Sequence, residues 1–302
     1  MSRPGRALVV GESLVDVVTA ADGTTLSRSP GGSPMNVATA LARLGIPVSL
    51  ITWVGGDYHG DLIRSHLETS GVHLISVGSA RTTSTAVARL RADGAAEYEF
   101  DLTWSPGQLS MPEPDGPLGP VTWLHVGSLG AALAPGRTDV LRLVETAVGA
   151  EIPVSFDPNF RRALQPDPAL AAREAKRFEA AATLVKMSDE DLEYLHPGAR
   201  IEDALQGRLA GRTTTVVITR GRFGAIGLDL TGTERVAAPI VDVVDTVGAG
   251  DSFMAALIAG RLLGVTDLRG LLHAAVQAAA KTCARRGADP PWRTDLPSSW
   301  PS

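Results

Sequence analysis

The sequence predicts an α/β fold in which helices cover both faces of a mostly parallel central sheet, giving three layers. Three observations support this prediction. Short apolar runs of strand length alternate with amphipathic stretches of helix length over most of the chain. The strand candidates are apolar on both faces, as buried parallel strands are. Two segments that interrupt the alternation contain Asp-Gly pairs, which are typical of antiparallel hairpins.

The predicted elements follow one another in a regular order. The strands are expected at residues 7–10, 48–54, 121–126, 154–156, 183–185, 215–218 and 225–228. The helices are expected at residues 34–44, 62–69, 138–147, 169–182, 189–195, 201–209 and 252–263. Residues 105–120 are rich in Pro and Gly and should be irregular. The proline-containing tail at 289–302 is expected to be coil and partly mobile.

The segment after the Gly-Gly pair at 31–32 carries both start and stop signals for a helix. Ser33 suits the N-cap, and Pro34 suits the first helical position. Apolar residues then recur at helical spacing until Gly45, a natural stop. Asn36 therefore falls in the first turn, where its side chain either contacts a ligand or assists the cap.

Two stretches depart from the strand–helix alternation. Residues 12–30 surround Asp22-Gly23, and residues 82–105 surround Asp93-Gly94. Polar and apolar residues alternate beside these pairs, which suits a sheet with one wet face. We expect both excursions to form a small antiparallel lid on a single domain of residues 1–302. Such a lid closes over a substrate and excludes water, unless the hairpins only extend the fold at a subunit interface.

Composition narrows the classes of function. Of the 302 residues, 44% are hydrophobic and 20% are charged, which is ordinary for a globular protein. The net charge of −5 gives no basic field, so neither nucleic acid nor a membrane is an expected partner. A single cysteine, Cys283, and the lack of a His-Glu-x-x-His pair argue against disulfides and a zinc site. The short apolar run near the N-terminus is no signal peptide, so a cytoplasmic location is expected.

Polar residues and glycines follow several predicted strands directly. Asp16 comes shortly after the first strand, residues 157–161 follow the strand that ends at residue 156, and Thr219 follows the strand 215–218. Because ligands of open α/β sheets bind beyond the carboxyl ends of the strands, these residues should share one binding edge. Turns also favour Gly and Asp, so the shared edge is the stronger observation.

The run Asp-Thr-Val-Gly-Ala-Gly-Asp at 245–251 leads directly into the predicted helix 252–263. Consecutive backbone N–H groups at a helix start bind phosphate. A carboxylate at such a site, here Asp251, indicates a chemical task, namely taking a proton from a hydroxyl that attacks the phosphate. The plain alternative is a Gly-rich turn with an acidic helix start. The sequence has neither a P-loop nor a Gly-x-Gly-x-x-Gly after its first strand, which leaves this loop as the phosphate site.

These motifs resemble those of the PfkB, or ribokinase-like, carbohydrate kinases, and the resemblance covers nearly the whole chain. Gly31-Gly32-Ser33-Pro34-Met35-Asn36 is similar to the N-terminal sugar motif of the family, and the run 245–251 is a complete, specific match to its C-terminal motif. Residues 11–16, 157–161 and 186–191 look most like the fructokinase branch. The resemblance implies a ribokinase-like three-layer αβα domain with a small β lid.

The resemblance also implies roles for individual residues. Asp251 would be the catalytic base, and the backbone of Gly248, Ala249 and Gly250 would form the anion hole. The residues implied for the sugar site are Asp16, Gly31, Gly32, Asn36, Arg89 and Arg161. Two of these have plain alternatives: Asp16 as a strand-end carboxylate, and Arg161 as a surface ion-pair partner instead of a clamp for an acidic group.

On the nucleotide side, the resemblance implies binding of ATP and Mg²⁺, with K⁺ as a further ion. The residues concerned are Asn159, Lys186, Ser188, Thr219, Gly221 and Gly224. Many relatives have Asn-x-x-Glu where Ser188 and Asp191 stand, and the shorter carboxylate favours metal contact through water. Lys186 either approaches the phosphates or lies in solvent at a helix start. The backbone near Asp245 and Val247 is similar to a monovalent-cation loop.

The expected function is transfer of the γ-phosphate of ATP to a primary hydroxyl of a monosaccharide. Fructose is the first expectation; 2-keto-3-deoxygluconate, ribose and a nucleoside are the alternatives. A sugar-binding homologue without catalytic activity is an alternative of a different class. The expected partners are a small-molecule sugar and ATP, with a homodimer formed through the lid as a further expectation.

Overall fold

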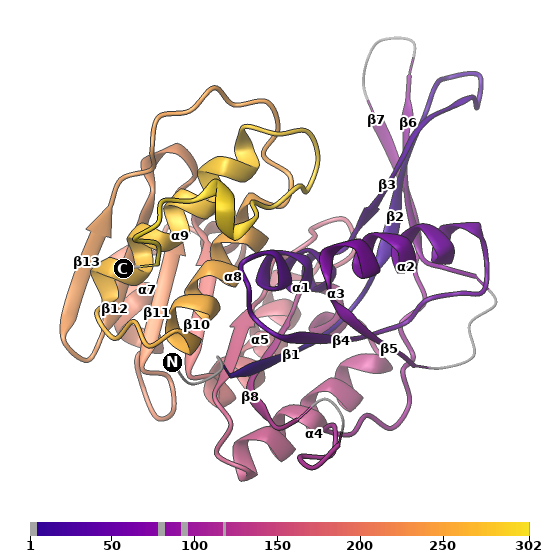
Figure 1. Ribbon diagram of the computed structural model, residues 1–302. Helices are drawn as coiled ribbons and strands as arrows, with labels where there is room; N and C mark the ends of the chain where they lie inside the picture. The colour runs from indigo at the N-terminus through magenta and orange to yellow at the C-terminus, as the bar shows by residue number, and fades with distance from the viewer. Residues whose placement is uncertain (1–4, 78–81, 92–95, 117–118, 302) are drawn as a thin grey trace.

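A large sheet forms the centre of the computed structural model, which describes residues 5–77, 82–91, 96–116 and 119–301 (Figure 1). Its strands are β1 (Arg6–Val10), β4 (Val48–Thr52), β5 (His73–Ser76), β8 (Val121–Gly127), β9 (Val154–Asp157), β10 (Leu184–Ser188), β11 (Thr215–Thr219), β12 (Ala225–Asp229) and β13 (Gly232–Val236). The spatial order is β13-β12-β11-β10-β9-β8-β1-β4-β5. Neighbours from β11 to β5 are parallel, and β12 and β13 add an antiparallel edge.

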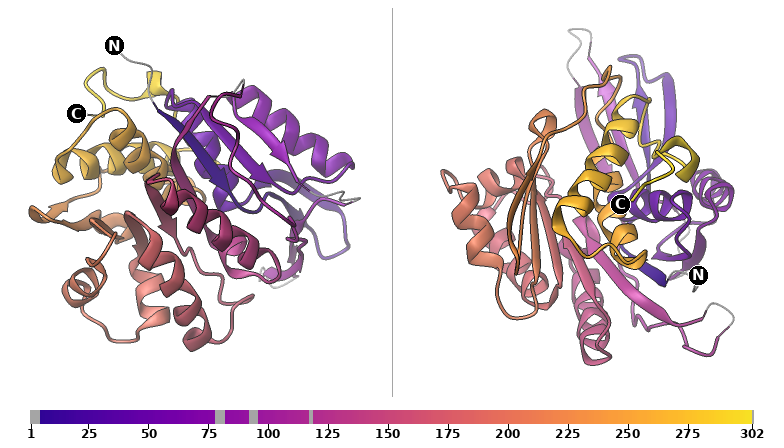
Figure 2. Two further views of the ribbon diagram at one scale, coloured as in Figure 1. Left: turned by 90° about the horizontal axis from the view of Figure 1, so that it is seen from below. Right: turned by 60° about the vertical axis from the view of Figure 1, so that its left-hand side comes forward.

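Helices cover both faces of this sheet (Figure 2). One face carries α1 (Ser33–Arg43), α2 (Tyr58–Ser70), α8 (Ala249–Leu262) and α9 (Leu268–Cys283). The other face carries α3 (Ser128–Ala132), α4 (Gly136–Gly149), α5 (Pro168–Ala181), α6 (Asp189–Leu195) and α7 (Ile201–Arg208). Each face has its own apolar core, because the strands between them are buried on both sides. The predicted three-layer α/β architecture is confirmed.

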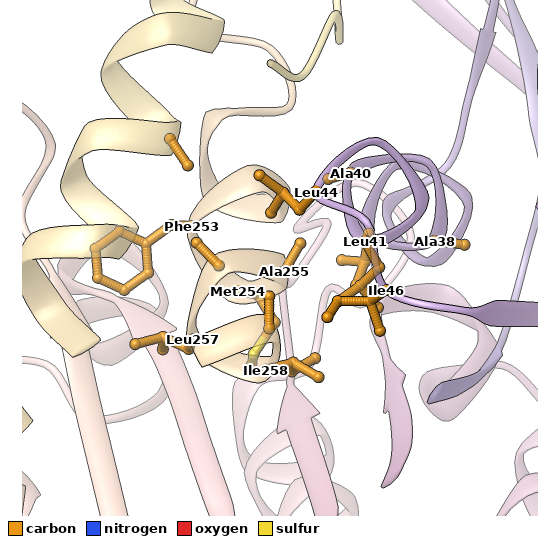
Figure 3. Close-up of a cluster of buried hydrophobic side chains, with 14 of the residues drawn as sticks. Ala38, Ala40, Leu41, Leu44, Ile46, Phe253, Met254, Ala255, Leu257 and Ile258 are labelled. Carbon is orange, nitrogen blue, oxygen red and sulfur yellow. The ribbon is translucent and has the colours of Figure 1, made fainter. Parts of the chain in front are cut away.

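The packing of α1 against α8 fixes the site described below. Leu41 of α1 and Leu44, the C-cap of this helix, lie in one buried cluster with Met254 and Ile258 of α8 (Figure 3). Burying a side chain of this size stabilises a fold by about 1.5–3 kcal/mol, so the two helices are held firmly together. The first turns of both helices therefore have a fixed position relative to each other.

A second, smaller sheet projects from the main body as the predicted lid (Figure 1). Its strands are β2 (Leu14–Thr19), β3 (Thr25–Gly31), β6 (Thr85–Leu90) and β7 (Ala96–Asp101), in the order β3-β2-β6-β7. Both hairpins are antiparallel, as predicted, whereas β2 and β6 join them by a parallel pairing that the sequence pattern does not specify. The Asp22-Gly23 turn connects β2 and β3; Asp93-Gly94 lies outside the described residues.

Several elements escape the sequence prediction. The edge strands β5 and β13 and the helices α3 and α9 were not expected. The described part of the tail is mostly coil, as predicted, but it is packed rather than mobile: Trp300 is 3% exposed, and its Nε1 donates to the carbonyl of Ala274.

In the described part of the chain, no helix combines the length and hydropathy needed to cross a membrane.

Candidate active site

The loop that leads into α8 is shaped by one carboxylate and one glycine. Asp245 accepts hydrogen bonds from the N–H of Val247 at 3.0 Å and from the N–H of Gly287 at 2.9 Å. These bonds hold the pKa of Asp245 below its usual value. Gly248 has a left-handed φ of 76°, and an added Cβ would lie 2.7 Å from the Cβ of Ala288. Only glycine meets both conditions without strain.

The residues predicted for the anion hole all lie at this helix start. Gly248 is the N-cap of α8, and Ala249 and Gly250 line the cavity described below. The N–H of Ala249 donates to the carbonyl of Thr246 at 3.2 Å, so it is engaged within its own turn. Their binding of a phosphoryl group stays a prediction.

Asp251 lies in the first turn of α8 and is 6% exposed. The hydroxyl of Ser33 donates to its Oδ1 at 2.6 Å, and the Nδ2 of Asn36 donates to its Oδ2 at 2.9 Å. The predicted N-cap role of Ser33 is wrong, because Gly32 is the N-cap of α1 and no side chain caps this helix. Two side chains of the sugar motif thus hold the candidate base.

The two glycines of that motif allow neighbouring segments to approach closely: Gly31, at the end of β3, faces Asp16 on β2, and Gly32 faces the segment between β1 and β2. An added Cβ on Gly32, whose φ is 108°, would lie 2.8 Å from the carbonyl oxygen of Glu12. An added Cβ on Gly31 would lie 2.2 Å from the Oδ2 of Asp16. The Asp16 side chain still reaches solvent, but neighbouring protein removes part of its hydration, and this desolvation raises its pKa. The positive charge of Arg161 acts against the rise. Asp16 therefore adjoins the glycine pair, and the pair leads directly to Ser33, which contacts Asp251.

The two arginines predicted for the sugar site differ in position. Arg161 is exposed and donates to the Oδ1 of Asn159 at 2.7 Å. Its charge is near enough to Asp16 to limit the rise in the pKa of that carboxyl. Arg89 pairs with Thr19 in the parallel β2–β6 register, three residues beyond the pair formed by Asp16. Because side chains alternate along a strand, Arg89 lies on the opposite face of the lid from Asp16. The structure does not bring Arg89 into the group.

Glu12 belongs to the run 11–16 noted in the sequence, but no role was predicted for its side chain, which is 5% exposed beside the sugar motif. Its Oε2 accepts a hydrogen bond from the N–H of Gly130 at 2.7 Å. Burial raises the pKa of Glu12 to about 7, against hydrogen bonds from Ser128 and Gly130 and the charge of Arg161. The available signal was an acidic residue placed directly after the apolar first strand.

Lys186 on β10 forms a buried ion pair with Asp157, with 2.8 Å between Nζ and Oδ2. Burial would lower the pKa of Lys186, but the carboxylates of Asp157, Asp191 and Asp251 raise it above its ordinary value. Burial raises the pKa of Asp157 to about 6, and the charge of Lys186 opposes this. An added Cβ on Gly250 would lie 3.1 Å from Nζ, so the ammonium adjoins the start of α8. The alternative of a lysine in solvent is therefore wrong.

Asp191 has both oxygens engaged by the protein. Its Oδ1 accepts from the N–H of Phe160 at 3.0 Å, and its Oδ2 accepts from the N–H and hydroxyl of Ser188 at 3.0 and 2.7 Å. These bonds close a capping box at the start of α6. Within the described ranges, no group of three or more His, Cys, Asp or Glu side chains is arranged to hold a metal.

A cavity of about 590 Å³ lies along this edge of the sheet. All the side chains and glycines predicted for the nucleotide line it: Asn159, Lys186, Ser188, Thr219, Gly221 and Gly224. Sequence reasoning missed its apolar wall, which includes Ile240, Val243, Val276, Ala279 and Cys283. The available signal was the cluster of apolar residues in the segment 237–247, which has no helix or strand pattern; in the structure Ile240 of this segment is fully exposed.

Comparison with known proteins identifies the family. The model of the pfkB family carbohydrate kinases matches residues 5–295. A fructokinase from Klebsiella pneumoniae is 34% identical over 284 residues, which cover 92% of each chain. The structure of a fructokinase double mutant from Vibrio cholerae O395, bound to fructose, ADP and potassium ion, is 28% identical with a TM-score of 0.78 and covers 95% of both chains.

The structure of an aminoimidazole riboside kinase from Salmonella enterica, in complex with aminoimidazole riboside and an ATP analog, is also similar. Its TM-score is 0.75 at 26% identity, over 94% of this chain and 95% of that one. The family match spans both the sugar motif at residues 31–36 and the loop at residues 245–251. The chain therefore belongs to the pfkB family of carbohydrate kinases.

Proposed function

We propose that this sugar kinase transfers the γ-phosphate of ATP to a primary hydroxyl of fructose. The observation that carries the proposal is the position of Asp251, which is bonded to Ser33 and Asn36 of the sugar motif and directly follows Gly250 in the cavity lining. The similarity to the Klebsiella pneumoniae and Vibrio cholerae fructokinases supports the choice of sugar.

In the proposed reaction Asp251 takes the proton of the sugar hydroxyl while that oxygen forms a bond to the γ-phosphorus. The bond from the γ-phosphorus to its bridging oxygen breaks, and ADP leaves. Asp16 accepts hydrogen bonds from sugar hydroxyls, since an ionised carboxylate is an acceptor only. The positive Lys186 ammonium and the N-terminal end of α8 stabilise the negative charge that develops on the phosphoryl group.

The cavity accounts for the rest of ATP. Its volume of about 590 Å³ falls within the range of small-molecule sites. The wall formed by Ile240, Val243 and Val276 suits the flat face of the adenine ring. Asn159, Lys186 and Gly250 line the part of the cavity that would receive the phosphates. The Thr219–Gly224 turn forms a further part of the lining.

The side chains fit a magnesium ion that is held largely by phosphate oxygens and water. Asp191, the predicted metal residue, has both oxygens engaged by Ser188 and Phe160, which favours contact through water. When bound, Mg²⁺ neutralises charge on the phosphates. For K⁺, the Asp245 side chain is engaged by backbone N–H groups, so backbone carbonyls near Val247 remain the candidate ligands.

The surroundings of Arg161 favour a neutral sugar over an acid such as 2-keto-3-deoxygluconate. Arg161 donates to Asn159, and its charge lies near the carboxylates of Asp16 and Glu12. A sugar carboxylate would have to compete with these groups for one guanidinium. Fructose, which carries no charge, meets no such competition.

The test is ADP release over a panel of fructose, 2-keto-3-deoxygluconate, ribose and aminoimidazole riboside. We expect the highest kcat/KM with fructose, and a loss of about 10²–10⁴ in kcat for Asp251→Asn. Asp242→Asn, in the exposed coil before α8, is the matched control and should keep its activity. A higher kcat/KM with another acceptor would overturn the choice of fructose. Sugar binding without ADP release would show a non-catalytic homologue.

A further inference from the structure

Ser33 makes a contact that the sugar motif alone does not explain. Its hydroxyl donates to the Oδ1 of Asp251 at 2.6 Å, and the two residues are 5% and 6% exposed. The hydroxyl makes no capping bond to its own helix. A hydrogen bond to an ionised carboxylate in a buried place is among the stronger ones that side chains make.

The position of Ser33 is fixed from both sides. Gly32 is pressed against the carbonyl of Glu12, and an added Cβ on Gly11 would lie 2.3 Å from the Cγ of Pro34. The apolar side chains between α1 and α8 (Figure 3) hold the two helices together, and this packing keeps Ser33 next to Asp251. The backbone of Ser33 therefore has little room to shift if its hydroxyl bond is lost.

We propose that Ser33 is a positioning residue, which holds one oxygen of Asp251 while Asn36 holds the other, so that the carboxylate plane is fixed toward the sugar hydroxyl. This inference rests on the proposed role of Asp251 as the base. Each carboxylate oxygen can accept more than one hydrogen bond, so a sugar hydroxyl still finds a lone pair on Asp251. Without the Ser33 hydroxyl, the carboxylate of Asp251 can rotate about its Cβ–Cγ bond, and fewer bound sugars meet it in a reactive orientation.

The first test compares Ser33→Ala with Ser33→Thr. We expect Ser33→Ala to lower kcat about tenfold to a hundredfold, with the KM for the sugar changed less than about threefold. Ser33→Thr keeps the hydroxyl and should restore most of kcat. The control is Thr39→Val, which removes a buried hydroxyl from the same helix away from Asp251 and should leave kcat unchanged. An unchanged kcat in Ser33→Ala overturns the proposal.

The second test asks whether Ser33 acts through Asp251. In an Asp251→Asn background, Ser33→Ala should lower the residual kcat less than about twofold, because the two side chains work as a unit. An equal loss in both backgrounds would show that Ser33 acts elsewhere. An inactive Asp251→Asn beside a fully active Ser33→Ala would refute the role of Ser33 and leave the proposed function standing. A fully active Asp251→Asn would refute the proposed function itself.

Thermal unfolding measured by circular dichroism accompanies each variant. Where Ser33→Ala does not fold, Ser33→Cys repeats the test, since it fills the same space with a much weaker donor. Its kcat should fall while its unfolding midpoint stays near that of the unchanged protein. A folded Ser33→Cys with full kcat contradicts the proposal.

Discussion

Lys186 and Asp157 form an ion pair that is almost completely removed from solvent, with 2.8 Å between Nζ and Oδ2 and side chains 5% and 1% exposed. Among the residues that the structure describes, none forms a hydrogen bond to the other oxygen of Asp157. Buried charges are costly unless they are paired, so each of these residues depends on the other. The pair adjoins Gly250 at the start of α8, where the phosphoryl group is proposed to bind.

Removing one member of this pair should therefore be costly. We expect Lys186→Met to lower the free energy of unfolding by about 3–5 kcal/mol, because Asp157 would be left buried without its partner. Adding Asp157→Asn should recover part of that loss. Urea unfolding measures both effects, with the exposed Lys176→Met on α5 as control. A single variant as stable as the control would mean that the pair contributes no net stability.

Comparing alanine substitutions at Gly248 and Gly264 distinguishes the effect of backbone strain from that of steric contact. Both have a left-handed φ, 76° and 90°, at opposite ends of α8, but only Gly248 adjoins another residue, Ala288. Gly264→Ala should cost about 1 kcal/mol in unfolding free energy and leave kcat unchanged. Gly248→Ala should cost more and lower kcat at least tenfold, because the helix start must shift. Equal kcat values for the two variants, in a coupled ADP assay, would contradict this.

Arg161 should govern how sugar binding depends on pH. Its charge opposes the raised pKa values of Asp16 and Glu12, so Arg161→Met should raise both further. As pH falls, Asp16 in the variant is then protonated at a higher pH and accepts sugar hydroxyls less well. We expect the KM for fructose to rise more at pH 6 than at pH 8, in assays at both values.

The neighbouring Arg162→Met is the control for that experiment, because Arg162 instead lies over the ring of Tyr194, 5.1 Å from its centre. Its KM should show the same pH dependence as the unchanged protein. An equal rise in KM at both pH values for Arg161→Met would indicate direct contact with the sugar rather than an effect on Asp16.

Glu12 should make stability depend on pH. Its pKa is raised from 4.5 to about 7, so the stability that protonated Glu12 contributes is fully present below about pH 4.5 and is lost as pH rises through about 7. Between pH 5 and pH 8, Glu12→Gln should gain about 2–3 kcal/mol relative to the unchanged protein in urea unfolding. Glu145→Gln, on the exposed side of α4, should gain nothing. A pH-independent difference for Glu12→Gln would contradict the raised pKa.

The sequence was most informative where a local pattern determines the structure. The apolar runs of β1 and β8 to β11 identified the buried strands, since strands covered on both faces read as continuous apolar segments. The glycines around Ala249 marked the start of α8 for a similarly local reason. The helix α9 was missed although Asp267 caps it and apolar residues recur at helical spacing, so there the signal was present.

Other features depend on contacts between distant segments. The hydroxyl of Ser33 meets Asp251 because α1 packs on α8, and helix spacing within either segment does not reveal this. The side of the lid on which Arg89 lies follows from the parallel β2–β6 register, which the hairpin signals leave open. Lys186 was the intermediate case, because its apolar neighbours Val185 and Met187 already indicate a buried strand.

The separation of Ser33 from Asp251 by 218 positions has a consequence for biosynthesis. A ribosome that has released the first half of this chain has supplied the glycines of the sugar motif and none of α8. The nascent polypeptide thus gains the complete candidate active site only while its last quarter is emerging. Each fragment of a chain divided between these segments would lack half of the centre, and phosphorylating activity would depend on their reassembly.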